Sequence, residues 1–261
     1  MVVGDAIRDA WAVLFPVECA GCGAADQALC GSCADALLPD VTARLGPDGL
    51  RVHTAVRYEG AVRRVILQFK EHGRTDATAT LARSLAAAVD AAVDAAVRAA
   101  VRAAVRATPG GVAASAIPCG AVSGGAVSGG ATVELLAVPS SRAAYRRRGY
   151  DPVRRLLGSA GLKHTALLVQ VRRRAAQKTL GVADRAINRV GAFVARRHLH
   201  GRRFILVDDV LTSGATLGEA ARAVRAAGGE VIGAATLAFT PRVLPIRDKS
   251  VGEDYGGAKG A

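Results

Sequence analysis

Residues 204–239 constrain the fold more than any other part of the chain, because they combine two strand patterns and a helix pattern with short joints. Residues 204–207 (Phe-Ile-Leu-Val) are an apolar run bounded by polar residues, the pattern of a short buried strand. A helix is predicted from about residue 216 to 227, and Gly228-Gly229 give the glycine signal that ends a helix. Residues 230–239 then form another strand. Strand, helix and strand in this order predict a right-handed crossover and an α/β fold with an open parallel sheet flanked by helices.

Two adjacent acids and a hydroxyl-rich loop follow the first of these strands. Asp208 and Asp209 stand at the C-terminal end of the strand, where parallel sheets place their ligands. The loop supplies consecutive backbone N–H groups at a helix N-terminus, a glycine that lets the backbone come close, and three hydroxyl groups. Its residues are Leu211, Thr212, Ser213, Gly214, Ala215 and Thr216. This combination predicts a phosphate in the loop and ribose hydroxyl groups at the carboxylates; solvated turn acids with Thr216 as a plain helix cap are the alternative.

The cysteines near the N-terminus form two Cys-x2-Cys pairs, made of Cys19, Cys22, Cys30 and Cys33. Four thiolates at this spacing close a tetrahedral zinc site with no open coordination position, so the metal is expected to be structural. A segment this small cannot bury a core alone, and metal binding would supply its folding energy. A redox pair, unpaired thiols and an iron–sulfur cluster are the alternatives.

The remaining segments are predicted from periodicity and composition. Apolar residues within 4–15 have the spacing of an amphipathic helix, whereas residues 50–59 alternate like a strand with one exposed face. A short helix follows over residues 60–70. The repeated Ala-Ala-Val-Asp and Ala-Ala-Val-Arg tetrads of residues 81–107 predict one elongated helix, around which the valines drift because a period of four differs from 3.6. Residues 109–131 repeat Gly-Ala-Val-Ser-Gly, which predicts a floppy insertion.

These patterns divide the chain into a small module and one larger domain. Residues 1–45 hold the N-terminal helix and the zinc module, and residues 46–245 form the α/β domain. The alanine-rich helix and the insertion interrupt this domain at about 85–131, and another strand begins at Val133. Residues 246–261 are polar and glycine-rich, so we expect a disordered tail.

The formal net charge is +13, with 35 Lys and Arg against 22 Asp and Glu, which favours phosphates, nucleotides or nucleic acid as partners. An arginine-rich solvated surface is the alternative. Charges interrupt the long Ala/Val stretch, so no membrane insertion is expected. Residues 1–15 lack the apolar run of a signal peptide, and we therefore expect a cytoplasmic protein, in which paired cysteines are more often metal or redox groups than disulfides.

The acidic strand and its loop resemble the phosphoribosyl pyrophosphate motif of the type I phosphoribosyltransferases, and the wider chain resembles the ComF family within them. The resemblance covers residues 19–80 and 133–240. Besides the cysteines and the acidic motif, it rests on Val138-Pro139, Arg146-Arg-Arg-Gly-Tyr150, Gln177, Arg185, Asn188 and Phe193, in that order. The sequence departs from the family at Asp151-Pro152, where an Asn-Gln pair is common.

The resemblance implies a type I phosphoribosyltransferase-like sheet and a role for each matching residue. Asp208 and Asp209 would hold the ribose 2′ and 3′ hydroxyls, and Leu211 to Thr216 the 5′-phosphate, while magnesium bridges the pyrophosphate. Ser140, Ser141 and Arg142 would form the pyrophosphate loop. Candidates for catalysis on or near a loop that closes over the reacting centre are Arg148, Gln177 and Arg185, with Asn188 beside them. Surface arginines and a capping Asn are the alternative.

Two functions from different classes follow from these observations. The first is an enzyme that transfers a phosphoribosyl group to an unknown acceptor, in DNA uptake or nucleotide metabolism. The second is a non-catalytic ligand sensor that uses the same pocket and holds single-stranded DNA. ComF-like proteins are associated with DNA uptake in competent bacteria, which implies the uptake machinery as a partner. Runs of two or three arginines at 146–148, 172–174, 196–197 and 202–203 suit a nucleic-acid backbone, although phosphate-site arginines and solvated surface explain them as well.

Overall fold

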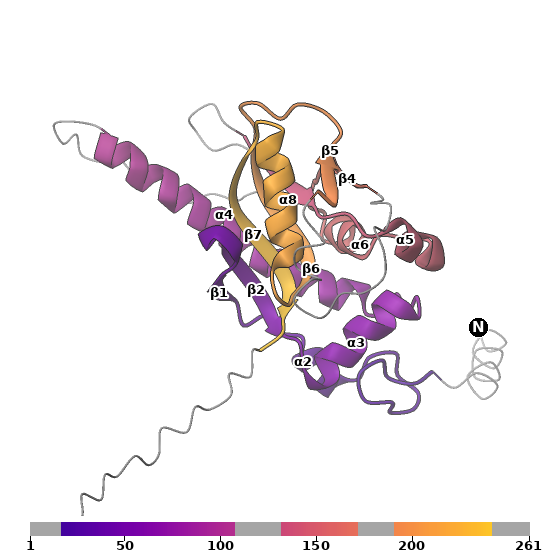
Figure 1. Ribbon diagram of the computed structural model, residues 1–261. Helices are drawn as coiled ribbons and strands as arrows, with labels where there is room; N and C mark the ends of the chain where they lie inside the picture. Colours follow the sequence, from indigo (N-terminus) through magenta and orange to yellow (C-terminus); the bar gives the residue numbers. More distant parts are fainter. Residues whose placement is uncertain (1–16, 108–131, 172–190, 242–261) are drawn as a thin grey trace, which may run out of the picture.

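The computed structural model describes residues 17–107, 132–171 and 191–241. It confirms a mixed α/β fold in which helices flank a mostly parallel central sheet (Figure 1). Outside the described residues lie the expected helix at 4–15, the Gly/Ser insertion, the polar tail, and Gln177, Arg185 and Asn188.

The central sheet has five strands, and the acidic strand occupies an interior position. In spatial order they are β1 (Thr42–Leu45), β2 (Arg51–Arg57), β7 (Glu230–Phe239), β6 (Arg203–Leu211) and β3 (Val133–Ala137). β1 runs antiparallel to β2, and all other neighbours pair in parallel. The predicted parallel pairing of the two strands in residues 204–239 is therefore confirmed.

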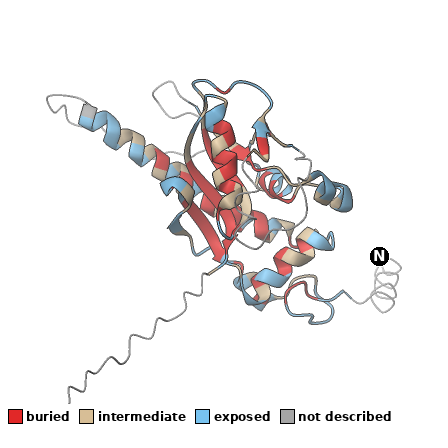
Figure 2. Cartoon of the chain, viewed as in Figure 1, coloured by how far each residue is buried: buried red, intermediate tan, exposed pale blue. Residues whose placement is uncertain are grey.

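Alternation along β6 sends side chains into two apolar clusters, one on each face of the sheet. Ile205 and Val207 join a cluster with α3 (Gly60–Glu71), α4 (Thr78–Ala107) and α6 (Pro152–Ser159). Phe204 and Leu206 join a second cluster with α8 (Ala215–Ala226) and the antiparallel pair β4 (Leu168–Gln170) and β5 (Phe193–Ala195). The buried residues accordingly follow the sheet and the helix faces turned toward it (Figure 2).

β6 is longer than the apolar pattern predicts, because its ladder continues through the polar residues. Asp208, Val210 and Leu211 pair with Thr236, Ala238 and Phe239 of β7. Ladder hydrogen bonds use backbone atoms, so a charged side chain does not stop them. The two acids therefore lie inside the C-terminal half of the strand instead of after it.

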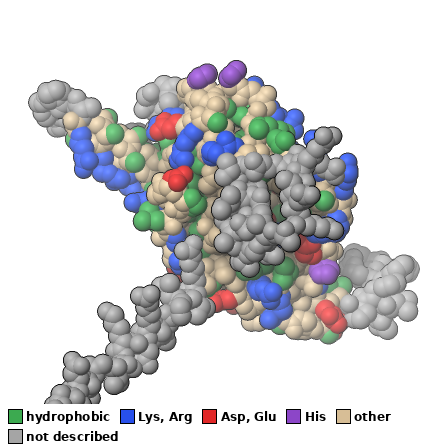
Figure 3. Space-filling view, in the orientation of Figure 1, with side chains coloured by type: hydrophobic (Ala, Val, Ile, Leu, Met, Phe, Trp, Pro, Cys, Tyr) green, Lys and Arg blue, Asp and Glu red, His purple; other side chains and the backbone are tan. Residues whose placement is uncertain are grey.

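The alanine-rich helix α4 begins slightly earlier than predicted and projects beyond the sheet (Figure 1). Val89, beside the sheet, is buried, whereas Val105, on the projecting part, is 62% exposed, and the expected drift of the valines around the helix stays a prediction. Its outer part carries the exposed arginines Arg98, Arg102 and Arg106. Figure 3 shows Lys and Arg side chains gathered along this projecting part. Among the described residues, no helix is both long and apolar enough to cross a membrane.

Three short elements complete the described part of the chain: α2 (Gly31–Asp35), the 3-10 turn η1 (Pro47–Gly49) and α5 (Arg142–Arg148). The cysteine segment shares the core of the main domain, because Ala20 and Leu37 belong to the same apolar cluster as α3 and α4. Ser84 of α4 also donates a hydrogen bond to the carbonyl oxygen of Leu37.

Candidate functional site

β6 and α8 are joined by the compact turn that the sequence predicts. β6 ends at Leu211 and α8 begins at Ala215, so Thr212, Ser213 and Gly214 make the whole connection. Gly214 is the N-cap residue in the left-handed region, with φ of 77°, and its carbonyl oxygen accepts the first helical hydrogen bond from Gly218 at 2.9 Å. The turn therefore places consecutive N–H groups at a helix N-terminus, as an anion site requires.

The turn is supported by η1, a contact that the sequence did not indicate. A Cβ atom on Gly214 would lie 2.6 Å from Pro47 Cδ, and one on Gly218 would lie 3.1 Å from Pro47 Cβ. Glycine is thus required at position 214 both for the backbone conformation and for the approach of Pro47. Arg225 of α8 and Asp48 of η1 add an exposed ion pair at 3.5 Å.

The two acids make different contacts, and the surroundings of Asp208 shift its pKa. Asp208 Oδ1 accepts a hydrogen bond from the backbone N–H of Asp209 at 2.8 Å. Asp209 Oδ2 lies 2.8 Å from Lys70 Nζ, and both side chains of this ion pair are mostly buried. Burial and the negative charge of Asp209 raise the pKa of Asp208 to about 7, against the opposing charge of Lys70. One of the two carboxyl groups is therefore poised to gain or lose a proton near neutral pH.

Lys70 stands at the end of α3 and serves as the cation of this pair. Burial lowers its pKa, but the charge and hydrogen bond of Asp209 and the charge of Asp208 outweigh it, so the net shift of the Lys70 pKa is upward. Lys70 therefore stays charged and partly compensates the two acids. Its role could not be read from the sequence, because nothing in residues 60–70 indicates a partner in β6.

Replacing Lys70 with methionine should raise the pKa of Asp208 above its present value of about 7, because the nearby positive charge disappears. A titration of the Asp208 carboxyl carbon by NMR measures this pKa in the ligand-free protein. Lys163→Met is the control, since Lys163 is an exposed lysine after α6. A pKa of Asp208 that stays unchanged or falls in Lys70→Met would contradict the assignment.

The predicted pyrophosphate loop follows β3 and lies beside the acidic strand. The register pairs Ala137 with Val207, and the N–H of Val138 donates to the carbonyl oxygen of Val207 at 2.9 Å. Ser141 caps α5, its hydroxyl accepting from the N–H of Ala144 at 3.1 Å. Arg142 is the first residue of that helix and is exposed.

Asp151, at the position where the sequence departs from the ComF pattern, holds this loop in place. Its carboxylate accepts the N–H of Ser140 at 3.0 Å and the N–H of Arg154 at 3.1 Å, which caps α6. The negative charge of Asp151 also contributes to the raised pKa of Asp208. Asp151 therefore connects the predicted pyrophosphate loop to the diacid electrostatically.

A cavity of about 350 Å³ opens next to this loop, between α5, α6 and β4. Ser140 and Arg142 line it, whereas the diacid and residues 211–216 are not among its lining residues. The predicted pyrophosphate loop thus follows β3, and the diacid and its turn belong to the adjacent strand β6. The cavity lies on the side of the loop that follows β3.

Arg148, the one catalytic candidate within the described residues, ends α5. Its Nε donates to the carbonyl oxygen of Ala144 at 3.2 Å, and one terminal guanidinium nitrogen is buried without a hydrogen-bond partner in the described part of the chain. Arg148 is not among the residues that line the cavity.

The β4–β5 pair is fixed to α8 by a buried carboxylate. Glu219 accepts the N–H of Phe193 at 3.1 Å and pairs with Arg222 at 2.7 Å, while Arg222 also donates to the carbonyl oxygen of Phe193 at 3.0 Å. Burial raises the pKa of Glu219, but its hydrogen bonds and the Arg222 charge outweigh this and leave the pKa lowered. An ionised Glu219 therefore anchors the wall that β4 and β5 form beside the cavity.

The four cysteines converge as predicted. Their sulfur atoms all lie within 4.8 Å of one another, and the Sγ atoms of Cys22 and Cys30 are 3.6 Å apart. No disulfide joins them, and four sulfurs at ~2.3 Å from a zinc ion would be separated by ~3.8 Å. Cys19 Sγ also accepts backbone N–H groups from Gly21 at 3.4 Å and Cys30 at 3.3 Å. The cluster therefore suits a metal ion such as zinc.

The ionisation of these thiols depends on local hydrogen bonds. Burial would raise the pKa of Cys19, but backbone N–H groups led by that of Cys30 lower it to about 6. Burial and the neighbouring thiols raise the pKa of Cys33 to about 12. A bound cation would favour the thiolate form of all four ligands.

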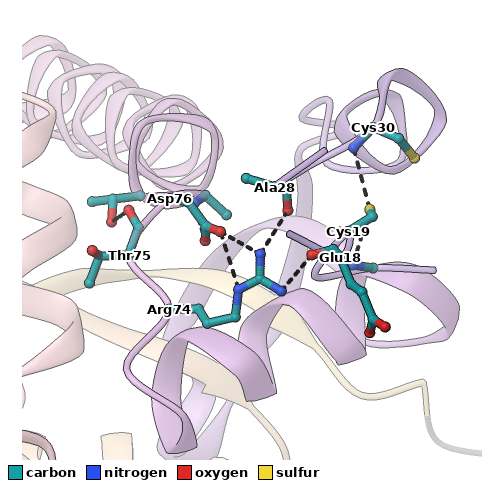
Figure 4. Close-up of polar contacts among 10 residues, drawn as sticks. Glu18, Cys19, Ala28, Cys30, Arg74, Thr75 and Asp76 are labelled. Atoms are coloured by element: carbon teal, nitrogen blue, oxygen red, sulfur yellow. Dashed lines mark hydrogen bonds and ion pairs between the residues drawn. The ribbon is translucent and has the colours of Figure 1, made fainter. Parts of the chain in front are cut away.

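Two arginines attach the cysteine segment to the main domain, and Figure 4 shows the contacts of one of them, Arg74. Arg74 donates to the carbonyl oxygens of Glu18 at 2.7 Å and Ala28 at 3.3 Å, and it also pairs with Asp76, two residues before α4. Arg64 of α3 donates to the carbonyl oxygen of Gly21. α3 therefore contacts the cysteine segment through Arg64 and the diacid through Lys70.

Comparison with known families agrees with this geometry. The family model of the phosphoribosyl transferase domain matches residues 147–252, whereas none of the curated proteins compared matches the chain. The matched range includes β6, the turn and α8, and excludes the cysteine cluster. The closer resemblance to the ComF family stays a prediction. Residues 147–252 thus match the model of a phosphoribosyl transferase domain, and a four-cysteine cluster suited to a metal ion precedes them in the chain.

Proposed function

We propose that the chain binds phosphoribosyl pyrophosphate, with magnesium, at Asp208, Asp209 and the turn from Leu211 to Thr216. The observation that carries this proposal is the connection between β6 and α8. There, two carboxyl groups precede a three-residue turn that leads into the N-terminus of α8, within the residues that the family model matches. Carboxylates accept hydrogen bonds from sugar hydroxyls, and N–H groups at a helix N-terminus bind phosphate.

The neighbouring groups have complementary tasks in this proposal. Lys70 keeps the pair of acids partly neutralised, so the ligand-free pocket does not carry two uncompensated charges. The loop from Ser140 to Arg142 would receive the pyrophosphate, and Asp151 must release the N–H of Ser140 if that group binds it. Magnesium would supply the positive charge that neutralises the pyrophosphate.

The proposed reaction is transfer of the phosphoribosyl group to an acceptor, with pyrophosphate as leaving group. The reacting sugar carbon becomes positively charged, so the protein must fix the phosphate, neutralise the pyrophosphate and exclude water. Arg148, Gln177 and Arg185 stay candidates for this step. A cytoplasmic location and a place in nucleotide metabolism or DNA uptake belong to the same proposal.

Binding is tested by calorimetry with phosphoribosyl pyrophosphate and magnesium. Asp208→Asn with Asp209→Asn should weaken the affinity more than tenfold, because the amides lose the charge that accepts the sugar hydroxyls. Asp90→Asn with Asp94→Asn is a matched control, since it removes the same charge from the exposed side of α4. Equal affinity of the diacid variant and the control would refute the proposed site.

Single-stranded DNA is a second candidate ligand, favoured by the arginine stripe on α4. Arg98, Arg102 and Arg106 recur every fourth residue on the projecting part of the helix, so they lie ~6 Å apart along one side. Only Arg98 has a carboxylate nearby in the described part of the chain, with Asp94 at 4.0 Å and both side chains 61% exposed. Such a stripe suits a row of phosphates.

A gel-shift titration of an oligonucleotide over a salt series tests this candidate. The triple change of Arg98, Arg102 and Arg106 to Gln should make the salt dependence shallower. The negative slope of log affinity against log salt should shrink in magnitude by ~2, the effect of losing three phosphate contacts. The control changes the scattered, exposed Arg57, Arg63 and Arg83 to Gln. Equal slopes for the two triple variants would exclude the stripe as the DNA site.

A further inference from the structure

The cavity beside the β3 loop is a positively charged hollow formed by separate elements. Its volume of about 350 Å³ lies within the range of small-molecule sites, ~300–1,000 Å³. Arg142 and Arg146 come from α5, Arg154 from α6, and Arg196 from the residue after β5. Four guanidinium groups thus surround a space in which one carboxylate, Asp151, is present.

These arginines have no competing partners in the residues that the structure describes. All four are exposed, and no carboxylate there lies within ion-pair distance of any of them. Asp151 is engaged by the N–H groups of Ser140 and Arg154. The positive charge of the cavity is therefore available to a ligand, and guanidinium groups suit phosphate oxygens.

The cavity also provides a surface for a flat group. Tyr145, which is half exposed, lines it together with the amide of Gln170 and apolar side chains that include Pro139 and Leu168. Aromatic rings and guanidinium planes stack on nucleobases, and an amide hydrogen-bonds their edges. Because Glu219 fixes β5 to α8, the β4–β5 wall is held in position before a ligand arrives.

We infer that this arginine-lined cavity binds a nucleotide-sized ligand, with a phosphate group among the four arginines and a planar base against Tyr145. The site is separate from the diacid and its turn, which are not among the lining residues. It shares Ser140 and Arg142 with the loop proposed to receive the pyrophosphate. The inference goes beyond that proposal by adding a nucleotide-sized ligand, and it does not depend on the diacid or the turn. The two sites are close enough for coupling, since Asp151 lines the cavity and its charge acts on Asp208.

Calorimetric titration of the full chain without magnesium tests the inference. The probes are nucleoside monophosphates, an uncharged nucleoside, inorganic phosphate and pyrophosphate. At least one nucleoside monophosphate should bind ten times more tightly than the nucleoside or inorganic phosphate. Tighter binding of pyrophosphate than of every monophosphate would overturn the inference, because the cavity would then be an extension of the pyrophosphate loop.

Neighbouring arginines supply matched variants. Arg146→Gln with Arg154→Gln should weaken nucleotide binding more than tenfold, and Tyr145→Ala should weaken it roughly tenfold. Arg147→Gln with Arg155→Gln removes the same charge from the adjacent positions of α5 and α6, which do not line the cavity, and should leave the affinity within about twofold.

The diacid variant distinguishes the two sites. Asp208→Asn with Asp209→Asn should retain nucleotide binding even where it loses phosphoribosyl pyrophosphate. Equal weakening in the two arginine double variants would indicate non-specific attraction, and loss of nucleotide binding in the diacid variant would place the nucleotide in the ribose pocket; either result overturns the inference. Binding of single-stranded DNA through these arginines with no affinity for mononucleotides would overturn it as well.

Discussion

Cys33→Ser should remove the metal from the cysteine cluster and lower the free energy of unfolding by more than ~4 kcal/mol, a loss typical of mutations that break a metal site. Cys33 is 3% exposed, and a Cβ atom added to Gly21 would lie 2.5 Å from its sulfur, so there is little room beside the sulfur for a water molecule to serve as a ligand instead. Losing the cluster would also release Ala20 and Leu37 from the apolar cluster that they share with α3 and α4.

Native mass spectrometry and thermal unfolding measure this effect together. Freshly purified protein should carry one metal ion per chain, and chelation should lower the melting temperature as far as Cys33→Ser does. Cys119→Ser is the control, because Cys119 stands apart from the two Cys-x2-Cys pairs in the sequence. A chain purified without metal, or a Cys33→Ser variant as stable as Cys119→Ser, would contradict the metal site. Strong visible absorption with bound iron would identify an iron–sulfur cluster instead of zinc.

Gly214→Ala should be the most damaging single substitution in the turn, with a loss of ~2–5 kcal/mol in unfolding free energy. The left-handed φ of 77° alone disfavours alanine by ~1–2 kcal/mol. The new Cβ would also meet Pro47 Cδ at 2.6 Å, and overpacking of this kind adds ~1–3 kcal/mol. Affinity for phosphoribosyl pyrophosphate should fall as well, because η1 and the turn must move apart.

Gly201→Ala separates the two contributions to this loss. Gly201 has a similar φ of 70°, but a Cβ atom added to it would have nothing within 4 Å, so it should lose only the backbone part. Denaturant unfolding of both variants, and of Gly214→Ala combined with Pro47→Ala, measures the difference. The double variant should recover part of the stability, since truncating Pro47 removes the clash. Equal losses at positions 201 and 214 would show that contact with Pro47 has no role.

The fold could be predicted because its determinants are local. Residues 204–207 alternate between two apolar faces, Gly228 ends α8 in the left-handed region with φ of 85°, and residues 230–239 return as β7. Each of these signals is complete within a few residues, and their order restricts the sheet to parallel pairing. The cysteine spacing was equally informative, since short loops within and between the pairs bring four sulfurs together.

The contacts that complete the candidate site could not be predicted, because each joins segments that are distant in sequence. Lys70 meets Asp209, Asp151 holds the N–H of Ser140, and Pro47 covers Gly214. The pattern around each residue describes its own helix or turn and does not identify the partner. The length of β6 was underestimated for a related reason, since hydropathy follows side chains whereas the ladder depends on the backbone.

The matched domain boundaries have a practical consequence for anyone who isolates this region. A fragment cut at residues 147–252 would keep β6 and β7 but discard β2 and β3, the strands that cover their outer edges. Two exposed parallel-strand edges invite pairing with other copies, and the fragment would aggregate instead of folding. It would also lack the lysine that neutralises its acids. β2, β3 and α3, which come before the matched range, are therefore structural components of the same folding unit.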